Sequence, residues 1–402
     1  MSADPSVANA PADRYAALLA EAAQVRGISL WHDAWRRLRK NYAAMTSLYF
    51  LITLACVAWL TPILPLQSPS FQLVDKANIF KPPRTLQRPL SVSLEEVEKF
   101  DREVAELTTK VRSARGADKK KLEAELQGKF RAHPFNRLWT NPGPIARAMI
   151  RTRMAIFGQW CIPSICGTDN LGRDVLSRIF WGARVSLMVG VLAAVVSLVI
   201  GVSYGAIAGY AGGLIDSGMM RAVDILYCIP FIFVVINLIM LLSDDAIKST
   251  LAKVGINQIV IFYIVIGAVY WLTMSRVVRG QVISLKHEQF IDAARTIGAG
   301  SGRIVFRHIV PNVLGIVIVY LTLTIPSVML FEAFLSFLGL GVQPPDVSWG
   351  QLVNDGIKVI TPIGIHWWLV LFPGLALALT LFALNFLGDG LRDALDPRMK
   401  NR

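Results

Sequence analysis

The apolar residues of this chain gather into uninterrupted blocks, each long enough to cross a lipid bilayer. A transmembrane helix needs about 20 predominantly apolar residues. Only 17% of the 402 residues are charged, well below the share in an ordinary soluble domain. The pattern predicts an all-helical integral membrane protein with six transmembrane helices. Their approximate bounds are 43–63, 185–208, 222–242, 258–274, 312–335 and 367–387.

Basic residues indicate on which side of the membrane each end of the chain lies. The first 42 residues are polar and end in the basic run 36–40, directly before the first block, as in a signal-anchor helix. An even number of spans puts both termini on one side, which the basic run makes the cytoplasm. The loop 275–311 agrees, with six Lys or Arg residues against two acidic ones. The expected segments are a cytoplasmic amino-terminal segment 1–42, a first span 43–63, an extracytoplasmic loop 64–184, a five-helix core 185–390 and a cytoplasmic tail 391–402.

The net charge of +13 is by itself compatible with nucleic-acid binding. The basic residues lie between the apolar blocks, however, where they orient a membrane protein. We therefore expect membrane lipid around this chain and no nucleic acid as a partner.

The loop 64–184 is unusually long and carries an excess of basic residues. Loops longer than about 60 residues cross the membrane largely regardless of charge, so this excess does not overturn the topology. Within the loop, 93–130 predicts a helical hairpin, because Ser93 and Glu96 form a capping box and apolar residues then recur at helical spacing. The apolar segment 145–166 is interrupted by three arginines and is not expected to span the membrane.

Four cysteines do not make the dense pattern of a disulfide scaffold. Cys161 and Cys166 lie in a segment expected outside the cytoplasm, where a disulfide can persist, but two free thiols fit the sequence equally well. Cys56 and Cys228 lie inside apolar blocks and are expected to pack against other helices.

Glycines recur every four residues along the second block and just beyond it. Such a strip lets two helices approach closely in a membrane, where no hydrophobic force drives their association. We expect this face to pack against another helix, with local flexibility at the helix end as the alternative. The glycines are Gly201, Gly205, Gly209 and Gly213.

The cytoplasmic segment 285–311 is expected to fold as a helix–turn–helix beneath the membrane. Residues 289–297 favour a short helix, a cluster of glycines at 298–302 favours a sharp turn, and 304–310 resumes a helix before Pro311. A segment between two spans cannot reach a path through the membrane. It can present a small, close-fitting surface to a soluble protein.

This segment resembles the EAA loop of binding-protein-dependent ABC transporter permeases. That motif reads Glu-Ala-Ala, three residues, Gly, nine residues, Ile-x-Leu-Pro. Asp292 replaces the Glu and Val310 the Leu, and His308 stands at the Ile position, as is usual in the peptide-transport branch. The residues that fall on the motif with the same spacing, and that the resemblance implies to be ATPase-coupling residues, are Asp292, Ala293, Ala294, Gly298 and Pro311.

Two further stretches are similar to the peptide and nickel branch of these permeases. One is GTDNLGRDVLSR at 167–178, and the other is EAFLSFLGLGVQPPDVSWG at 332–350. Shorter matches lie at 211–216 and 220–224. The resemblance covers about 30–60 and 165–400 and is closest to the second, C-type permease of dipeptide and oligopeptide importers. It transfers nothing to the hairpin.

The resemblance implies an importer-type ABC permease fold in the bacterial inner membrane and a division of labour among subunits. A homologous second permease would share the path, two ATPase subunits would bind the ATP, and an extracytoplasmic solute-binding protein would deliver the substrate. The expected substrate is a di- or oligopeptide, with nickel or another small solute as the alternative.

The sequence contains no motif for catalysis of its own. It has no Gly-x-x-x-x-Gly-Lys-Ser/Thr, and Ile291 stands where a zinc site beginning at His287 would need a second histidine. We expect a non-catalytic subunit without cofactor or metal. A secondary transporter that works alone is the alternative from another class, although the spans lack carboxylate or histidine relays.

Glu332 is an acidic residue well inside a predicted span, where a charge is costly and is a functional candidate by default. Two roles stay open for it: pairing with an arginine at 173, 178 or 184, or contact with the translocation path. Asn385 in the last span is a second path candidate, with helix packing as its alternative. The tryptophans near span ends, expected to be interfacial anchors, are Trp271, Trp349, Trp367 and Trp368.

Overall fold

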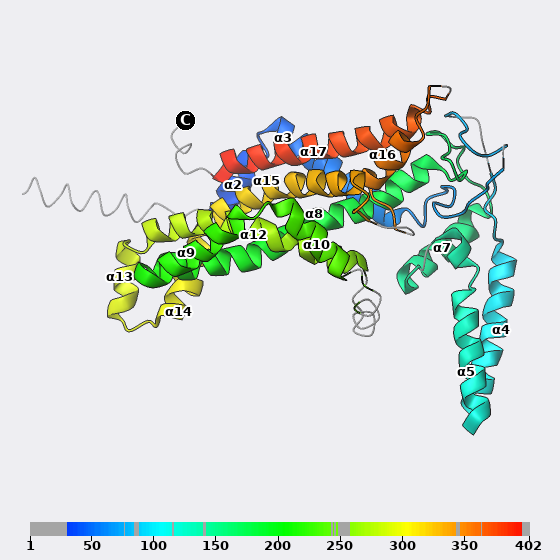
Figure 1. The fold of residues 1–402 in the computed structure, drawn as a ribbon, viewed down its shortest axis with the longest axis horizontal. Coiled ribbons are helices and arrows are strands. Elements are labelled where there is room, and N and C mark those ends of the chain that lie inside the picture. Colours follow the sequence, from blue (N-terminus) through cyan, green and yellow to red (C-terminus); the bar gives the residue numbers. More distant parts are fainter. Residues whose placement is uncertain are drawn as a thin grey trace, which may run out of the picture.

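The chain is all-helical, as predicted. The computed structural model describes residues 30–75, 77–83, 88–114, 116–139, 142–242, 244, 247, 258–342, 346–362 and 364–395. Apart from an isolated bridge between Thr168 and Asp174, these residues form only helices and loops. The longest helices lie side by side along the long axis of the molecule, and a pair of helices projects sideways at one end (Figure 1).

Four helical stretches of the described chain are long and apolar enough to cross a membrane. They are α3 (Tyr42–Leu60), α8 (Val175–Ala211), the run Ser301–Phe337 that ends in α15 (Val310–Phe337), and α17 (Trp368–Leu395). A fifth would be α9 (Gly213–Cys228) with α10 (Phe231–Leu242), which meet at a bend of 84°. The remaining predicted block, 258–274, lies in α12 (Gln258–Leu285). The count of six spans therefore stays a prediction.

Two of these helices differ from the blocks predicted for them. The second block was predicted to start at 185, whereas α8 begins at Val175, because the Asp174 carboxylate accepts a hydrogen bond from the Ser177 N–H at 2.8 Å and caps the helix there. The block 222–242 breaks next to Pro230, because proline has no N–H to continue a helix.

The glycine strip packs against α12, as predicted, for three of its four members. A Cβ on Gly201 would lie 2.6 Å from the Met274 Cβ, and a Cβ on Gly205 would overlap the Ser275 carbonyl oxygen. Gly209 approaches the Arg279 carbonyl in the same way. Gly213 has nothing within 4 Å and a φ of +54°, so it serves the turn into α9 instead. The absence of side chains therefore lets α8 and α12 pack with their backbones close together.

A separate small core lies at the end of the molecule from which the helix pair projects. The pair is α4 (Leu94–Ser113) and α5 (Gly116–Arg131), followed by α6 (Phe135–Leu138) and α7 (Pro144–Phe157). Ser93 caps α4 by accepting from the Glu96 N–H at 3.2 Å, as its sequence pattern indicates. The core residues at the base of the pair are Leu90, Val92, Val97, Phe135, Leu138, Trp139, Ile150, Met154 and Cys161.

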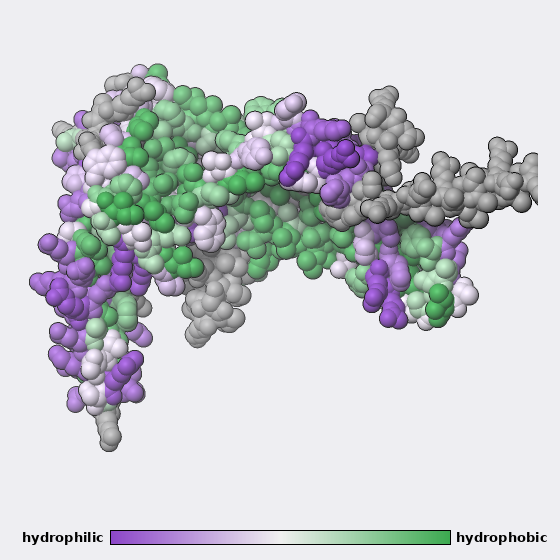
Figure 2. Space-filling view, turned by 180° about the vertical axis from the view of Figure 1, so that it is seen from behind, coloured by the Kyte–Doolittle hydropathy of each residue, from purple (hydrophilic) through white to green (hydrophobic). Residues whose placement is uncertain are grey.

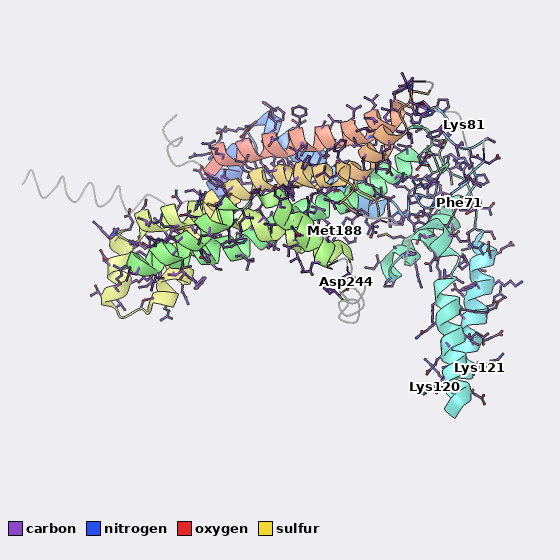
Figure 3. The ribbon with its side chains drawn as sticks, viewed as in Figure 1. Phe71, Lys81, Lys120, Lys121, Met188 and Asp244 are labelled. Carbon is purple, nitrogen blue, oxygen red and sulfur yellow. The ribbon has the colours of Figure 1, made fainter. Side chains whose placement is uncertain are left out.

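The surface changes character between the two regions. In Figure 2 the bundle is covered mainly by apolar residues, whereas the projecting pair is covered mainly by hydrophilic ones. Lys120 and Lys121 lie toward the far end of the pair, and Phe71 and Lys81 lie near its base (Figure 3). An apolar bundle beside a polar projection fits a membrane-embedded part and a part in water.

Two tryptophans predicted to be interfacial anchors are core residues instead. Trp349, the first residue of α16 (Trp349–Lys358), is fully buried, and its indole N–H donates to the Ile179 carbonyl at 2.8 Å. Trp368 is buried and its indole donates to the Thr168 carbonyl at 3.3 Å. Their N–H groups find backbone partners in the fold and need no interface. Trp367 is half exposed, and Trp271 packs on the Tyr204 ring.

Cys56 and Cys228, predicted to pack against other helices, are both exposed in the single chain. Each lies on an apolar helix that has one free face, and periodicity alone does not tell which face that is.

Candidate functional site

The segment between α12 and α15 lies at the opposite end of the molecule from the projecting helix pair (Figure 1). It contains α13 (Gln289–Thr296), the short α14 (Ser301–Arg303) and a π-helical turn (Ile304–Ile309) that runs into α15. Ile291 of α13 is fully buried with Ile304 and Ile309. One face of α13 is therefore fixed to the start of α15.

Gly298 ends α13 in the way that its place in the sequence suggests. Its φ is +87°, a left-handed conformation that residues with a Cβ rarely adopt. The Gly298 N–H donates to the Arg295 carbonyl at 2.9 Å, and the Ala299 N–H donates to the Ala294 carbonyl at 3.0 Å. These two bonds form a Schellman motif, which closes the helix and fixes the direction of the turn.

The other face of α13 is exposed and of mixed character, with Phe290 and Ala293 beside the polar Gln289, Asp292, Arg295 and Thr296. Ala293 and Gly298 are exposed, and no other heavy atom of the described chain would lie within 4 Å of a Cβ on Gly298. Asp292 is exposed and pairs with Arg295 at 3.2 Å. Ile297, just after the helix, is 87% exposed.

The five residues of the predicted coupling set do not all lie on this surface. Asp292, Ala293 and Gly298 do, whereas Ala294 packs with the buried cluster beneath. Pro311 is exposed at the first turn of α15. The motif does not include three exposed apolar residues of this segment. They are Ile297, Phe290 at 41% exposure and Phe306 at 53%. In the sequence, apolar residues within an otherwise polar loop were the signal that could have identified them.

Two ion pairs connect α12 to α9 just before the segment between α12 and α15. Arg279 binds both carboxylate oxygens of Asp216 at 2.6 Å. Arg276 binds Asp224 at 2.5 Å and stacks on the Tyr227 ring at 4.1 Å. From the sequence alone, these arginines served only to predict on which side of the membrane the loop 275–311 lies. Their partners belong to the stretches 211–216 and 220–224, which carried the resemblance.

At the opposite end, the stretch 167–178 forms a buried ion network. Asp169 accepts from Arg178 at 2.6 Å and from Arg173 at 2.8 Å, and Arg178 also lies 3.6 Å from Asp355 of α16. Residues 71–75 and 77–83 lie beside this turn, with the Phe80 N–H donating to the Asp169 carbonyl at 3.1 Å. The network thus ties the start of α8 to α16.

Glu332 does not pair with an arginine, so that prediction was wrong. It is 1% exposed and accepts hydrogen bonds from the Ser336 hydroxyl at 2.8 Å and the Ser348 hydroxyl at 2.7 Å. Arg173 and Arg178 bind Asp169, and Arg184 packs over the rings of Trp59 and Trp181. Asn385 is exposed on α17, where the path role stays a prediction.

Cys161 and Cys166 are not bonded to each other in the structure and belong to different cores. Cys161 packs with Trp139 and Met154 at the base of the helix pair, and its sulfur receives a hydrogen bond from the buried Arg153 at 3.1 Å. Cys166 packs in the bundle with Trp368. Burial raises the pKa of the Cys166 thiol to about 12, so the reactive thiolate is scarce.

These features define a class of protein: a helical membrane protein that presents a rigid, exposed helix at one end of its bundle. Residues 201–401 match the family described as binding-protein-dependent transport system inner membrane component, and 29–83 match the N-terminal TM domain of oligopeptide transport permease C. The chain belongs to this family of ABC transporter permeases.

Relatives of known name agree with this membership. The dipeptide transport system permease protein DppC of Bacillus subtilis is 46% identical over 58% of this chain and 68% of its own length. The OppC oligopeptide permeases of Haemophilus influenzae and Escherichia coli are 48% and 50% identical, over 58% of this chain and 70% and 72% of theirs. A structure of the MetNI methionine ABC transporter aligns with a TM-score of 0.42 and 18% identity, over 55% of this chain and 96% of that one. At this TM-score the alignment does not define the fold.

Proposed function

We propose that this chain is the C-type permease subunit of an ATP-driven importer that brings di- or oligopeptides into the cell. The names of the relatives, dipeptide and oligopeptide permeases, support the substrate class. The observation that carries the proposal is α13, a helix with one buried face and one exposed face on which the small Ala293 lies among polar residues and Phe290. Such a surface is suited to close contact with a soluble partner.

The buried face of α13 would transmit movement of that partner into the bundle. Ile291 is packed on Ile304 and Ile309, and packed cores move as units and do not deform continuously. A partner that pulls α13 would therefore move α15 and α12 with it. The Arg279–Asp216 pair would carry the displacement on to α9. Rocking of packed helices in this way gives alternating access.

The remaining parts of the proposal follow from the sequence. The chain would cross the bacterial inner membrane six times with both termini in the cytoplasm, so that the helix pair α4–α5 lies outside. It would assemble with a homologous second permease, two ATPase subunits that bind the ATP, and an extracytoplasmic solute-binding protein. The chain itself would hold no cofactor and hydrolyse nothing.

Purification in detergent tests the proposal against its alternatives. The chain should bring ATPase subunits with it, and ATP turnover should rise only when a peptide-loaded binding protein is added. A chain that purifies alone and transports in response to a proton or sodium gradient is a secondary transporter. Stimulation by a nickel-loaded binding protein, and not by a peptide-loaded one, would assign the other branch.

A further inference from the structure

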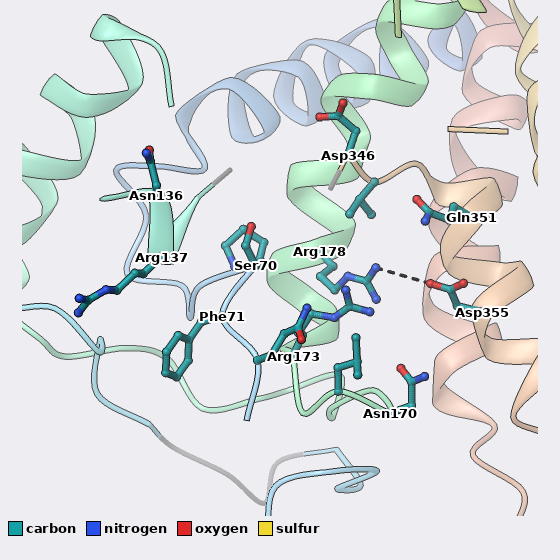
Figure 4. Close-up of a pocket in the computed structure, with 14 residues that line it drawn as sticks. Ser70, Phe71, Asn136, Arg137, Asn170, Arg173, Arg178, Asp346, Gln351 and Asp355 are labelled. Atoms are coloured by element: carbon teal, nitrogen blue, oxygen red, sulfur yellow. Dashed lines mark ion pairs between the residues drawn. The ribbon is translucent and has the colours of Figure 1, made fainter. Parts of the chain in front are cut away.

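Figure 4 shows a cavity of about 740 Å³. It lies at the end of the molecule opposite α13. This volume is in the range of about 300–1,000 Å³ that is typical of small-ligand sites. Four separate parts of the chain form its walls: 69–72 after α3, Asn136 and Arg137 of α6, 170–178 at the start of α8, and 346–355 before and in α16. The loop 64–184 and the helix bundle therefore form the cavity together.

The cavity is lined by charges of both signs. Arg137, Arg173 and Arg178 supply guanidinium groups, and Asp346 and Asp355 supply carboxylates. Arg178 is 2% exposed, and its Nε has no hydrogen-bond partner within the described chain. A buried donor without a partner costs free energy.

The two carboxylates of the cavity differ in their partners. Asp355 lies 3.6 Å from Arg178, so its charge is compensated by the protein. No ion pair to Asp346 is found among the residues that the structure describes. Burial raises the pKa of Asp346, because removal from water disfavours the charged carboxylate. A positively charged group in the cavity would supply that cation.

Amide groups complete the walls. Gln72, Asn136, Asn170 and Gln351 line the cavity, and the Gln351 side-chain oxygen is buried without a donor within the described part. Primary amides can donate to a carbonyl and accept from an N–H at the same time. They therefore match the backbone of a peptide, and apolar lining residues such as Phe71, Leu171 and Val347 could contact its side chains.

We propose that this cavity binds a short peptide by its two charged ends, the ammonium group at Asp346 and the carboxylate at the guanidinium groups of Arg137 and Arg173. The inference rests on the proposed function and adds a peptide site on the permease itself. It also gives the loop 64–184 a role, because Arg137 lies in α6 of that loop. A charged segment of a partner protein is the rival occupant. The amides of the walls favour the free peptide.

Direct binding to the purified complex of permeases and ATPases, without the binding protein, tests the proposal. Equilibrium dialysis would compare tri-alanine with its N-acetylated form and with its C-terminal amide. The wild-type complex should bind tri-alanine, and each blocked form should bind at least about tenfold more weakly, since each loses a charge-assisted contact.

Two charge-removing variants should then separate the ends of the ligand. Asp346→Asn should abolish the preference for a free ammonium group and keep the preference for a free carboxylate. Arg137→Gln should weaken the preference for the carboxylate and leave that for the ammonium. Lys121→Ala, toward the far end of the helix pair, should behave as wild type. A variant that merely unfolds loses both preferences together, which thermal denaturation of the same sample would detect.

Several outcomes overturn the proposal. One is equal binding of free and blocked peptides, and another is an unchanged preference in Asp346→Asn. A third is weakened docking of the binding protein in Asp346→Asn without change in tri-alanine binding, which would assign the cavity to the partner protein. If tri-alanine does not bind while a loaded binding protein still stimulates ATP turnover, the cavity is refuted and the proposed function stands. If no ATPase accompanies the chain, the proposed function fails.

Discussion

Arg279 of α12 and Asp216 of α9 form a bidentate ion pair, with both nitrogen–oxygen distances at 2.6 Å. The pair lies roughly one and a half helical turns before the end of α12. After that end, the chain continues into the segment that contains α13. The ion pair is the polar counterpart of the glycine contacts between α8 and α12. Together they make the base of the bundle a rigid unit.

Removing this ion pair should loosen the unit. Asp216 is the better buried partner, and Asp216→Asn should lower the stability of the permease by about 1 kcal/mol, because a charge-assisted bidentate contact is lost. Thermal denaturation in detergent measures the effect. The matched control is Asp224→Asn in the more exposed pair with Arg276, which should have a smaller effect. An equal loss in both variants would mean that the bidentate geometry contributes nothing.

Adding a methyl group to the glycine strip should separate α8 from α12. Gly205→Ala places a Cβ against the Ser275 carbonyl oxygen, which is backbone and cannot move away easily. The expected cost is about 1–3 kcal/mol, as for other overpacked sites. Gly280→Ala in α12 is the control, since nothing lies within 4 Å of its Cβ, and it should be neutral or stabilising. A harmless Gly205→Ala would show that the helices are not in backbone contact.

Glu332 should prove structural. Glutamine keeps an oxygen that can accept from the Ser336 and Ser348 hydroxyls, so Glu332→Gln should fold and transport nearly as wild type. Glu332→Ala leaves both buried hydroxyls without that acceptor and should lower the yield of folded protein. Size-exclusion chromatography and peptide uptake measure the two effects. Normal folding of Glu332→Gln with transport abolished would instead support the translocation-path role.

The base of the α4–α5 pair should weaken at low pH through His133. Burial and then the charge of Arg147 lower the pKa of this histidine, although Asp101 at 3.4 Å acts in the opposite direction. Its neutral Nδ1 accepts from the Phe135 N–H at 3.1 Å. A lowered folded-state pKa means that the unfolded state binds more protons, so stability falls as the pH drops below about 6.5.

Hydrogen exchange of the helix pair at pH 7 and pH 5 tests this. Protection should decrease at pH 5 in the wild type, and the decrease should be smaller in His133→Gln, which does not titrate. The same loss of protection in both proteins would remove His133 from the explanation.

A bulky residue on the exposed face of α13 should disturb the partner without disturbing the fold. Ala293→Trp should keep thermal stability and reduce co-purification of the ATPase subunits severalfold, because a close-fitting surface does not accommodate it. Ala105→Trp on the exposed face of α4 is the control and should assemble normally. Normal assembly and uptake with Trp at 293 would exclude this face as the contact.

The sequence was most informative where a local rule decides the structure. The capping box at Ser93, the turn at Gly298 and the glycine strip all depend on residues close together in the chain or on one helix face. The turn at Gly298 formed as the pattern indicates, Ser93 caps its helix while the Glu96 carboxylate binds Arg137, and three of the four strip glycines pack against α12. The family membership also came from local motifs, which span contiguous residues.

Long-range partners could not be predicted in this way. Arg279 and Asp216 lie 63 residues apart, and the partners of Glu332 include a serine 16 residues away in another helix. Trp349 and Trp368 were assigned to an interface because of their positions, whereas their indoles donate to backbone far away in the sequence. Periodicity tells which residues share a face, but not which face meets which.

The central claim is that α13 is exposed in the cytoplasm and is held there by the ATPase subunits. A cysteine introduced at Ile297, whose side chain is 87% exposed, reports on this directly through a membrane-impermeant maleimide. Intact cells should show no labelling above the wild-type chain, inverted membrane vesicles should show strong labelling, and the assembled ATPase subunits should protect the site. Labelling of this cysteine in intact cells would contradict the account.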